Sequence, residues 1–318
     1  MGLPENQIVE LSEGARDWPS SKQNSTHQVW GFACFVLILL GCFSRPLYAL
    51  LKFAAHSALY SYILLIPLIS VYLIWSKRNK LSLGSRPLSI LASAPLLVGA
   101  AIAALAFLKK ATGGSQSVNY LVSNNLACLL FLWAGTLFFF GFATLRTISF
   151  PVLFLIFMVP LTNSLQRGLE MFFQVSSAAA AHLLFQICGT PVLQQGTNFQ
   201  LPGFSFEVAP ECSGIHSSLV LFITSLLAGH LLLQKVWTRA LLALFVVPLA
   251  ILRNGFRILV IGELCVHVSP EMIHSYIHRR GGPLFFAGSL IPFFFFLLFL
   301  RRIESTASSA LKEKVLGG

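Results

Sequence analysis

Hydrophobic residues in this chain fall into long unbroken runs separated by short polar segments. A run of about 20 apolar residues is long enough to cross the hydrocarbon core of a bilayer as a helix. The pattern therefore predicts an all-α polytopic membrane protein with about eight transmembrane helices, the first and fifth being short. The predicted helices are Val29–Phe43, Leu59–Trp75, Pro87–Leu108, Tyr120–Phe142, Ile148–Leu161, Ile215–Leu233, Ala240–Gly262 and Leu284–Leu300.

The segment Ser164–Gly189 is the ambiguous one, because polar residues interrupt its helical pattern. It suits either a ninth span or a helix lying at the membrane surface. With eight spans and a cytoplasmic N-terminus, every basic cluster faces the cytoplasm, as the positive-inside rule favours. We therefore predict eight spans, with this segment on the outer surface. The clusters are Lys77-Arg78-Lys80, Lys235 with Arg239, Arg301-Arg302, and Lys312 with Lys314.

Residues 190–210 differ from the rest, since apolar and polar residues alternate there around Pro202-Gly203. Such alternation about a turn predicts a small extracytoplasmic β-hairpin. Residues 1–26 are polar and lack the pattern of a cleavable signal peptide, so we expect a cytoplasmic segment followed by a signal anchor. The predicted organisation is this segment, a transmembrane domain over 27–302 and a cytoplasmic tail over 303–318.

Composition agrees with a membrane protein, because 56% of the residues are hydrophobic and 10% are charged, against about 25% charged in soluble domains. The net charge of +11 arises mainly at predicted helix ends, where basic residues meet anionic lipid. We therefore expect membrane lipid and no nucleic acid as a partner. Neither Cys-x-x-Cys nor His-Glu-x-x-His occurs, and Asp17 is the only aspartate, so we expect no metal, no cofactor and no aspartate pair.

Cys212 is the candidate nucleophile. It lies in the motif Glu211-Cys212-Ser213-Gly214-Ile215, after the polar extended segment and before an apolar helix. A thiol at such a boundary can reach water, unlike one in the middle of the bilayer. Four other cysteines lie in apolar runs, where a cysteine is usually a small buried hydrophobe. They are Cys34, Cys42, Cys128 and Cys188.

The seventh predicted helix carries Arg253, Asn254 and Arg257 within an apolar run. Charged groups inside a membrane are costly and usually mark a function or a specific pair. Residues three or four apart share a helix face, so Arg257 lies near both other residues. An arginine here either stabilises negative charge on a substrate or pairs with Glu263, the only carboxylate of this helix.

The loop from His274 to Pro283 contains a second histidine, His278. Histidine exchanges protons near neutral pH. A thiol, an arginine and a histidine at outer helix ends form an acyl-transfer set, in which histidine moves protons and arginine stabilises the oxyanion. His216 is an alternative base, because it follows Cys212 by four residues on the same helix face; otherwise it serves as a cation at the helix end.

Three motifs together resemble the exosortase/archaeosortase family, and the resemblance spans roughly 62–300. They are Glu211-Cys212-Ser213-Gly214-Ile215, Asn254-Gly255-Phe256-Arg257-Ile258, and His278-Arg279-Arg280-Gly281-Gly282 with Phe285-Phe286. The resemblance implies a multi-pass bacterial inner-membrane protein with its active site at the periplasmic face. It implies a cysteine transpeptidase, analogous to sortases, that processes secreted proteins at a C-terminal signal with a Pro-Glu-Pro-like motif, an apolar helix and a basic tail.

By the same resemblance, Cys212 matches the family nucleophile, Arg257 the family arginine and His278 the family histidine. Arg253 and His274 match no motif position and rank second, with Asn254 as a supporting residue. His216 departs from the pattern, since many members have arginine there. The implied partners are secreted proteins with a sorting signal and an acceptor such as a surface glycan or lipid.

Two other classes of function compete with this interpretation. Buried arginines among eight helices also suit a transporter or channel subunit for an anionic substrate. Against it, no repeated pair of Gly/Pro-interrupted helices is evident in the sequence. A non-catalytic membrane assembly factor is the second alternative, but it leaves the three motifs unexplained.

Overall fold

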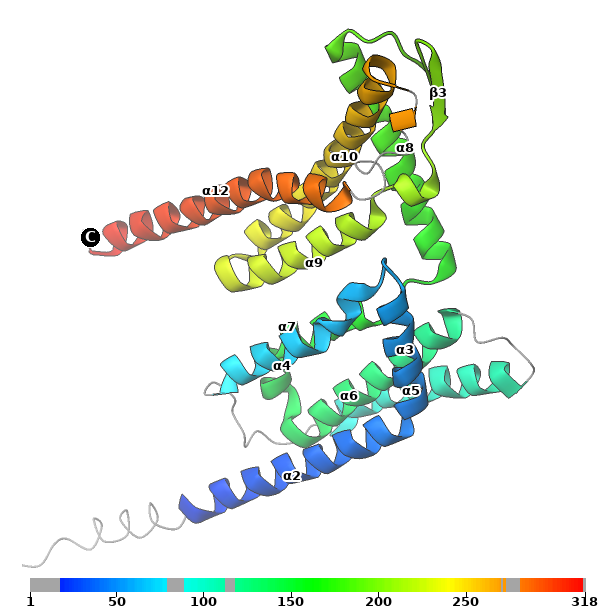
Figure 1. The fold of residues 1–318 in the computed structure, drawn as a ribbon. Coiled ribbons are helices and arrows are strands. Elements are labelled where there is room, and N and C mark those ends of the chain that lie inside the picture. Colours follow the sequence, from blue (N-terminus) through cyan, green and yellow to red (C-terminus); the bar gives the residue numbers. More distant parts are fainter. Residues whose placement is uncertain (1–17, 79–88, 112–117, 270, 273–280, 317–318) are drawn as a thin grey trace, which may run out of the picture. The chain divides into compact units, whose positions relative to one another are not determined.

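The computed structural model describes residues 18–78, 89–111, 118–269, 271–272 and 281–316. The chain forms two compact units, 1–162 and 163–318, which are drawn together in Figure 1. The first unit is helical in its described residues. Its elements are α2 (Trp18–Cys42), α3 (Ser44–His56), η1 (Ser61–Leu64), α4 (Ile66–Ser76), α5 (Ser89–Ala111), α6 (Val118–Thr147), α7 (Ser149–Phe154) and η3 (Leu155–Met158).

Close packing of α2 against α6 depends on glycines opposite aromatic rings. A Cβ atom added to Gly135 would lie 2.2 Å from Cε1 of Phe35, and one added to Gly31 would lie 2.8 Å from Cε1 of Phe139. Small residues let membrane helices approach closely, which gains dispersion contacts where lipid offers no hydrophobic driving force. Each helix therefore supplies both a glycine and a ring to this crossing.

The second unit combines helices with a small sheet. Its elements are α8 (Asn163–Cys188), β1 (Leu193–Gln195), β2 (Asn198–Leu201), β3 (Phe204–Glu207), η4 (Pro210–Cys212), α9 (Ile215–Leu232), α10 (Val236–His267) and α12 (Gly282–Leu316). The sheet is antiparallel in the order β1-β2-β3, with Leu193 opposite Gln200 and Leu201 opposite Phe204. The predicted hairpin is thus corrected to three strands, because residues 193–195 also pair with β2.

The sheet lies against α8 and α10 through one buried cluster (Figure 1). Phe185 of α8 and Phe199 of β2 are fully buried there, with ring centroids 6.0 Å apart. Gly262 of α10 leaves room for this cluster, since an added Cβ would lie 2.5 Å from the ring of Phe185. The apolar positions of the strand segment therefore join it to the helices that follow.

A second buried cluster joins α9, α10 and α12. Beside it, Glu304 of α12 accepts hydrogen bonds from the backbone N–H groups of Gln234 and Lys235, both at 2.8 Å, and from the hydroxyl of Thr238. These groups lie at the start of α10, where the first N–H groups have no partner within the helix. Glu304 therefore caps α10 from a neighbouring helix.

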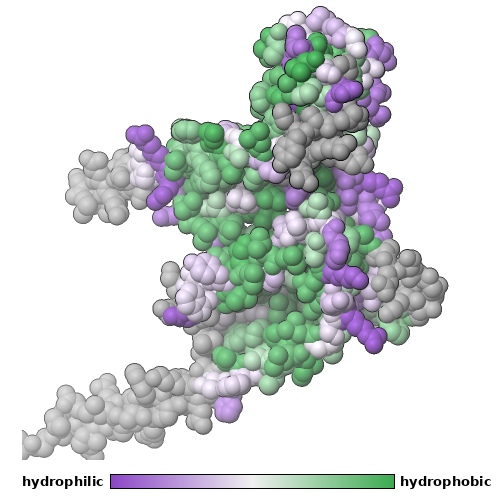
Figure 2. All heavy atoms as spheres, in the orientation of Figure 1, coloured by the Kyte–Doolittle hydropathy of each residue, from purple (hydrophilic) through white to green (hydrophobic). Residues whose placement is uncertain are grey.

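Most of each predicted apolar run is helical among the described residues, although residues 159–161 at the end of the fifth run are not, and residues 87–88 of the third run lie outside the described residues. The number of spans is not confirmed. Among the described residues, five helices are long and apolar enough to cross a membrane, or six if α2 and α3, bent by 69°, are one broken span. The segments 61–76, 92–108 and 149–158 form shorter apolar helices. Figure 2 shows hydrophobic side chains over much of the surface of both units, as expected for contact with lipid.

Helix α8 is among the five candidate spans. Its placement on the outer surface therefore stays a prediction, as do the membrane side of the sheet and the division at residues 26 and 302. Helix α12 continues without a break from the last apolar run to Leu316. The polar residues from Trp18 onwards likewise belong to α2.

Candidate active site

Cys212 lies at the end of η4, between the sheet and α9. Ala209 has extended backbone and Pro210 begins the short helix, so the chain turns there: the N–H of Cys212 donates to the carbonyl of Ala209 at 2.9 Å. The Cys212 side chain is half-buried and packs against the cluster around Phe185. The thiol therefore lies at the boundary that the sequence predicts, neither fully enclosed nor fully exposed.

Gly214 completes the cysteine turn, residues 210–214, and begins α9. Its backbone is left-handed, with φ of 74°, a conformation that side chains other than glycine adopt at a cost. Its carbonyl oxygen accepts hydrogen bonds from the N–H of Ser218 at 3.0 Å and the hydroxyls of Ser218 and Ser217 at 2.8 and 3.1 Å. An added Cβ would lie 3.0 Å from Oδ1 of Asn254. Both the left-handed backbone and this close approach therefore favour glycine at position 214.

Two adjacent residues of α10 hold the cysteine turn. Nδ2 of Asn254 donates to the backbone carbonyl of Cys212 at 2.8 Å. Nη2 of Arg253 donates to the carbonyl of Gly214 at 3.3 Å and to the hydroxyl of Ser218 at 3.1 Å. Asn254 is 3% exposed and Arg253 is 8% exposed. The position of the cysteine is thus set by a helix that follows it in the chain.

Two donors beside the cysteine turn are buried without a hydrogen-bond partner among the described residues. They are Nη1 of Arg253 and the hydroxyl of Ser213. Buried polar groups are normally paired, and an exception asks for an explanation. A guanidinium N–H and a hydroxyl suit an oxyanion or carbonyl oxygen, because both groups donate to negative charge. The turn therefore carries unused donors of the kind that acyl transfer needs.

Arg257, the higher-ranked arginine of the sequence, lies one helical turn beyond Arg253 and is half-buried. Glu263, its alternative partner, has both carboxylate oxygens in other contacts. Oε1 accepts a hydrogen bond from Thr190 at 2.5 Å, and Oε2 lies 3.1 Å from Nε2 of His267. The contact with Thr190 ties α10 to the segment that enters the sheet.

The sequence placed Arg253 behind Arg257, whereas the structure places Arg253 directly on the cysteine turn. It also brings in Ser213 and Ser218, which sequence reasoning did not single out. The available signal was the pair Ser217-Ser218, polar residues in the first turn of an otherwise apolar helix. The rotation of α10 about its axis decides which of the two arginines contacts the first turn of α9, and in the structure it is Arg253.

His216 is exposed in the first turn of α9, four residues after Cys212. The candidate bases His274 and His278 lie outside the described residues. Within the described ranges, no three His, Cys, Asp or Glu side chains gather as a metal site needs. The structure therefore brings together Cys212, Asn254 and Arg253, and the role of each remains a prediction.

The apolar helices and the cysteine turn together define a multi-pass membrane protein with a thiol and buried cationic donors at a helix end. The sequence model of the transmembrane exosortases (Exosortase_EpsH) matches residues 53–295, well over half of the chain. The chain belongs to the transmembrane exosortase family. No curated protein and no solved structure matches it.

Proposed function

We propose that this protein is a membrane-embedded cysteine protease and transpeptidase that cleaves C-terminal sorting signals from secreted proteins. The observation that carries the proposal is the half-buried Cys212 in a turn that Asn254 and Arg253 of α10 hold through hydrogen bonds to the backbone carbonyls of Cys212 and Gly214. Family membership supports it, since residues 53–295 match the exosortase model. The substrate class follows from the resemblance of the three motifs, including the Pro-Glu-Pro-like signal.

The proposed reaction begins when a base takes the proton of the Cys212 thiol. The sulfur then attacks the carbonyl carbon of the scissile peptide bond, and the resulting oxyanion is stabilised by guanidinium donors. The intermediate collapses as the C–N bond breaks, and the base returns its proton to the leaving amine. A thioester remains on Cys212. An acceptor nucleophile, or water, then attacks this thioester and regenerates the thiol.

The proposed roles of Arg257 and the histidines rest on the family resemblance, and those of Arg253 and Asn254 rest on their contacts with the cysteine turn. Arg257 is the oxyanion donor of the family pattern, while Arg253 and Asn254 are positioning residues that hold the cysteine turn. His278 is the proposed base, with His216 as the alternative. The proposed location is the bacterial inner membrane, with the cysteine turn at the periplasmic face and both chain ends in the cytoplasm.

The test compares the proteins secreted by cells that carry the wild-type gene, no gene, or a variant in which one cysteine is replaced. Mass spectrometry of the secreted proteins detects loss of a C-terminal segment. We expect cleavage to vanish with Cys212→Ala and with Cys212→Ser, because a serine hydroxyl stays protonated without a much stronger base. Cys188→Ala is the matched control, since Cys188 is an exposed cysteine of α8.

Membrane insertion and amount of each variant are matched by immunoblotting of the membrane fraction. Normal cleavage by Cys212→Ala would exclude the thiol mechanism and favour an assembly factor. An anionic-substrate transporter would also keep its activity in that variant.

A further inference from the structure

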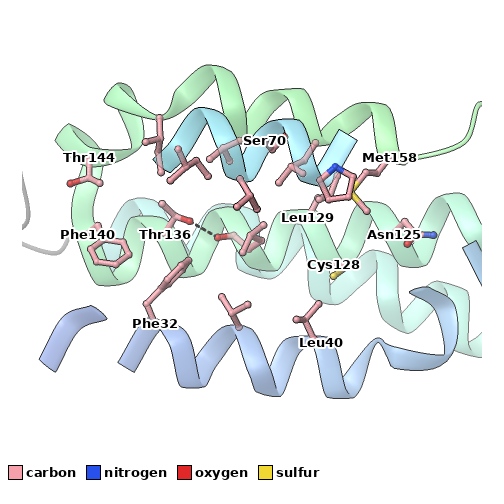
Figure 3. Close-up of a pocket in the computed structure, with 18 of the residues that line it drawn as sticks. Phe32, Leu40, Ser70, Asn125, Cys128, Leu129, Thr136, Phe140, Thr144 and Met158 are labelled. Atoms are coloured by element: carbon pink, nitrogen blue, oxygen red, sulfur yellow. Dashed lines mark hydrogen bonds between the residues drawn. The ribbon is translucent and has the colours of Figure 1, made fainter. Parts of the chain in front are cut away.

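The first unit contains a cavity of about 580 Å³ that the proposed reaction does not use. It lies between α2 and α4, with α6 along its length and α7 with η3 at one side (Figure 3). Val71 of α4, which is 66% exposed, belongs to the lining, so the cavity opens to the surface of the unit. Its volume is within the range of about 300–1,000 Å³ that small-molecule sites occupy.

The lining is almost wholly hydrophobic. One face of α6 supplies it at helical spacing, through Asn125, Leu129, Leu132, Thr136 and Phe140. Among the described residues that line the cavity, none carries a charge. An ion or a charged headgroup would therefore lose its hydration without gaining a partner, so the expected occupant is apolar and neutral.

Two polar atoms of the lining lack a partner. Ser70 of α4 is 1% exposed and Asn125 of α6 is 3% exposed, and neither the Ser70 hydroxyl nor Oδ1 of Asn125 has a hydrogen-bond partner among the described residues. The amide nitrogen of Asn125 is used, since it donates to the carbonyl of Leu121 at 2.7 Å. By contrast, the Thr136 hydroxyl donates to the carbonyl of Leu132 at 2.8 Å (Figure 3). Neither the Ser70 hydroxyl nor Oδ1 of Asn125 is accessible to a water-sized molecule in the cavity, so both lie beneath its apolar surface.

The length and width of the cavity decide whether its occupant is a single lipid acyl chain or a peptide helix. From Asn125 to Phe140 the lined face of α6 extends for about 22 Å, at about 1.5 Å per residue. Spread over that length, 580 Å³ of space for the centre of a water-sized sphere corresponds to a channel about 9 Å across between the lining atoms. A helix with its side chains is about 10–12 Å wide and does not fit. One lipid chain reaches about 15 Å, half of the hydrocarbon thickness, and fits within the channel.

We propose that this cavity is a binding site for one acyl chain of a membrane lipid. The chain is held by contacts with the apolar side chains that line the cavity. The opening between α2 and α4 admits the chain from the surrounding bilayer, and the charged headgroup stays outside.

The test uses the full-length chain purified in detergent, stripped of lipid and exposed to vesicles of phosphatidylethanolamine and phosphatidylglycerol. Native mass spectrometry then counts the lipids that each protein molecule retains. Ser70→Phe fills the cavity from α4. Ser76→Phe is the matched control, because Ser76 lies on the same helix and is exposed. We expect one retained lipid in the wild type and in Ser76→Phe, and at least a tenfold lower retained fraction in Ser70→Phe.

Ser70→Ala is a second control, because it changes the same residue without filling the space. We expect Ser70→Ala to retain one lipid as the wild type does. The unfolding midpoint of Ser70→Phe, compared with that of the wild type, shows whether this variant is folded when its retention is measured.

Equal retention by Ser70→Phe and Ser76→Phe would overturn the proposal. So would wild-type protein that retains no lipid, which would indicate that water fills the cavity. Retention of only one of the two phospholipids would also contradict it, because an uncharged lining cannot distinguish their headgroups. Loss of retention with intact cleavage of secreted proteins would support a lipid site that is separate from the reaction.

Discussion

Replacing Gly214 with alanine is expected to displace the cysteine turn. The left-handed backbone of Gly214, with φ of 74°, costs an alanine about 1–2 kcal/mol. The added Cβ would also lie 3.0 Å from Oδ1 of Asn254 and 3.3 Å from Nη2 of Arg253. If the Asn254 side chain moves away, the backbone carbonyl of Cys212 loses its hydrogen bond, which costs about 1–3 kcal/mol for a buried group.

Gly203 provides a matched control for this substitution. It has the same φ of 74°, but an added Cβ would meet no atom within 4 Å. Gly203→Ala should therefore lower the free energy of unfolding by about 1–2 kcal/mol, through the backbone alone. Gly214→Ala should lower it by about 2–5 kcal/mol, the sum of the backbone cost and the lost hydrogen bond.

Two measurements check this prediction. Denaturant titration in micelles gives the difference in the free energy of unfolding between the two alanine variants. The rate at which Cys212 reacts with a maleimide, in a chain whose other cysteines are replaced, reports the position of the thiol. We expect an altered rate in Gly214→Ala and an unchanged rate in Gly203→Ala. Equal destabilisation and equal labelling rates in both variants would refute the proposed contact with Asn254.

Four further substitutions test other contacts. Arg253→Lys should lower both the unfolding midpoint and the cleavage of secreted proteins, because an ammonium cannot reproduce the planar fork of a buried guanidinium; an unchanged midpoint would contradict its contacts with the cysteine turn. Arg257→Lys should lower cleavage about 10²-fold or more, and cleavage at the wild-type rate would contradict its role as oxyanion donor. Glu304→Ala should lower the free energy of unfolding by at least about 1.5–3 kcal/mol, the contribution of one hydrogen bond to a charged group, and a loss below about 0.5 kcal/mol in a denaturant titration would refute the cap. Gly135→Ala should cost about 1–3 kcal/mol by overpacking, and a double-mutant cycle with Phe35→Ala should recover most of it; simple additivity would refute the α2–α6 contact.

The local features of the chain could be predicted from the sequence. Most of each predicted apolar run is helical among the described residues, and Leu193–Gln195, Asn198–Leu201 and Phe204–Glu207 form strands. Cys212 lies between those strands and a helix, as its neighbours in the sequence indicate. These features depend on the hydrophobicity and spacing of residues close together in the chain, which a sequence displays directly.

The count of spans was less predictable. Composition cannot separate a membrane-spanning helix from an interfacial helix when polar residues interrupt an apolar pattern, as they do in α8. Eight spans were expected, whereas five helices among the described residues are long and apolar enough, or six if α2 and α3 form one span. The sequence also did not predict strand β1. Its three residues, Leu193–Gln195, are too few to show an alternating pattern on their own.

The sequence by itself determined that this is a helical membrane protein with a cysteine at a helix end and arginines in an apolar helix. The tertiary structure decided that Arg253 holds the cysteine turn together with Asn254, that Glu304 caps α10, and that Ser70 and Asn125 line one cavity. Each of these contacts joins residues far apart in the chain. These contacts depend on the rotation and crossing angle of each helix. The packing of complete helix faces against each other sets both, and a short stretch of sequence does not contain that information.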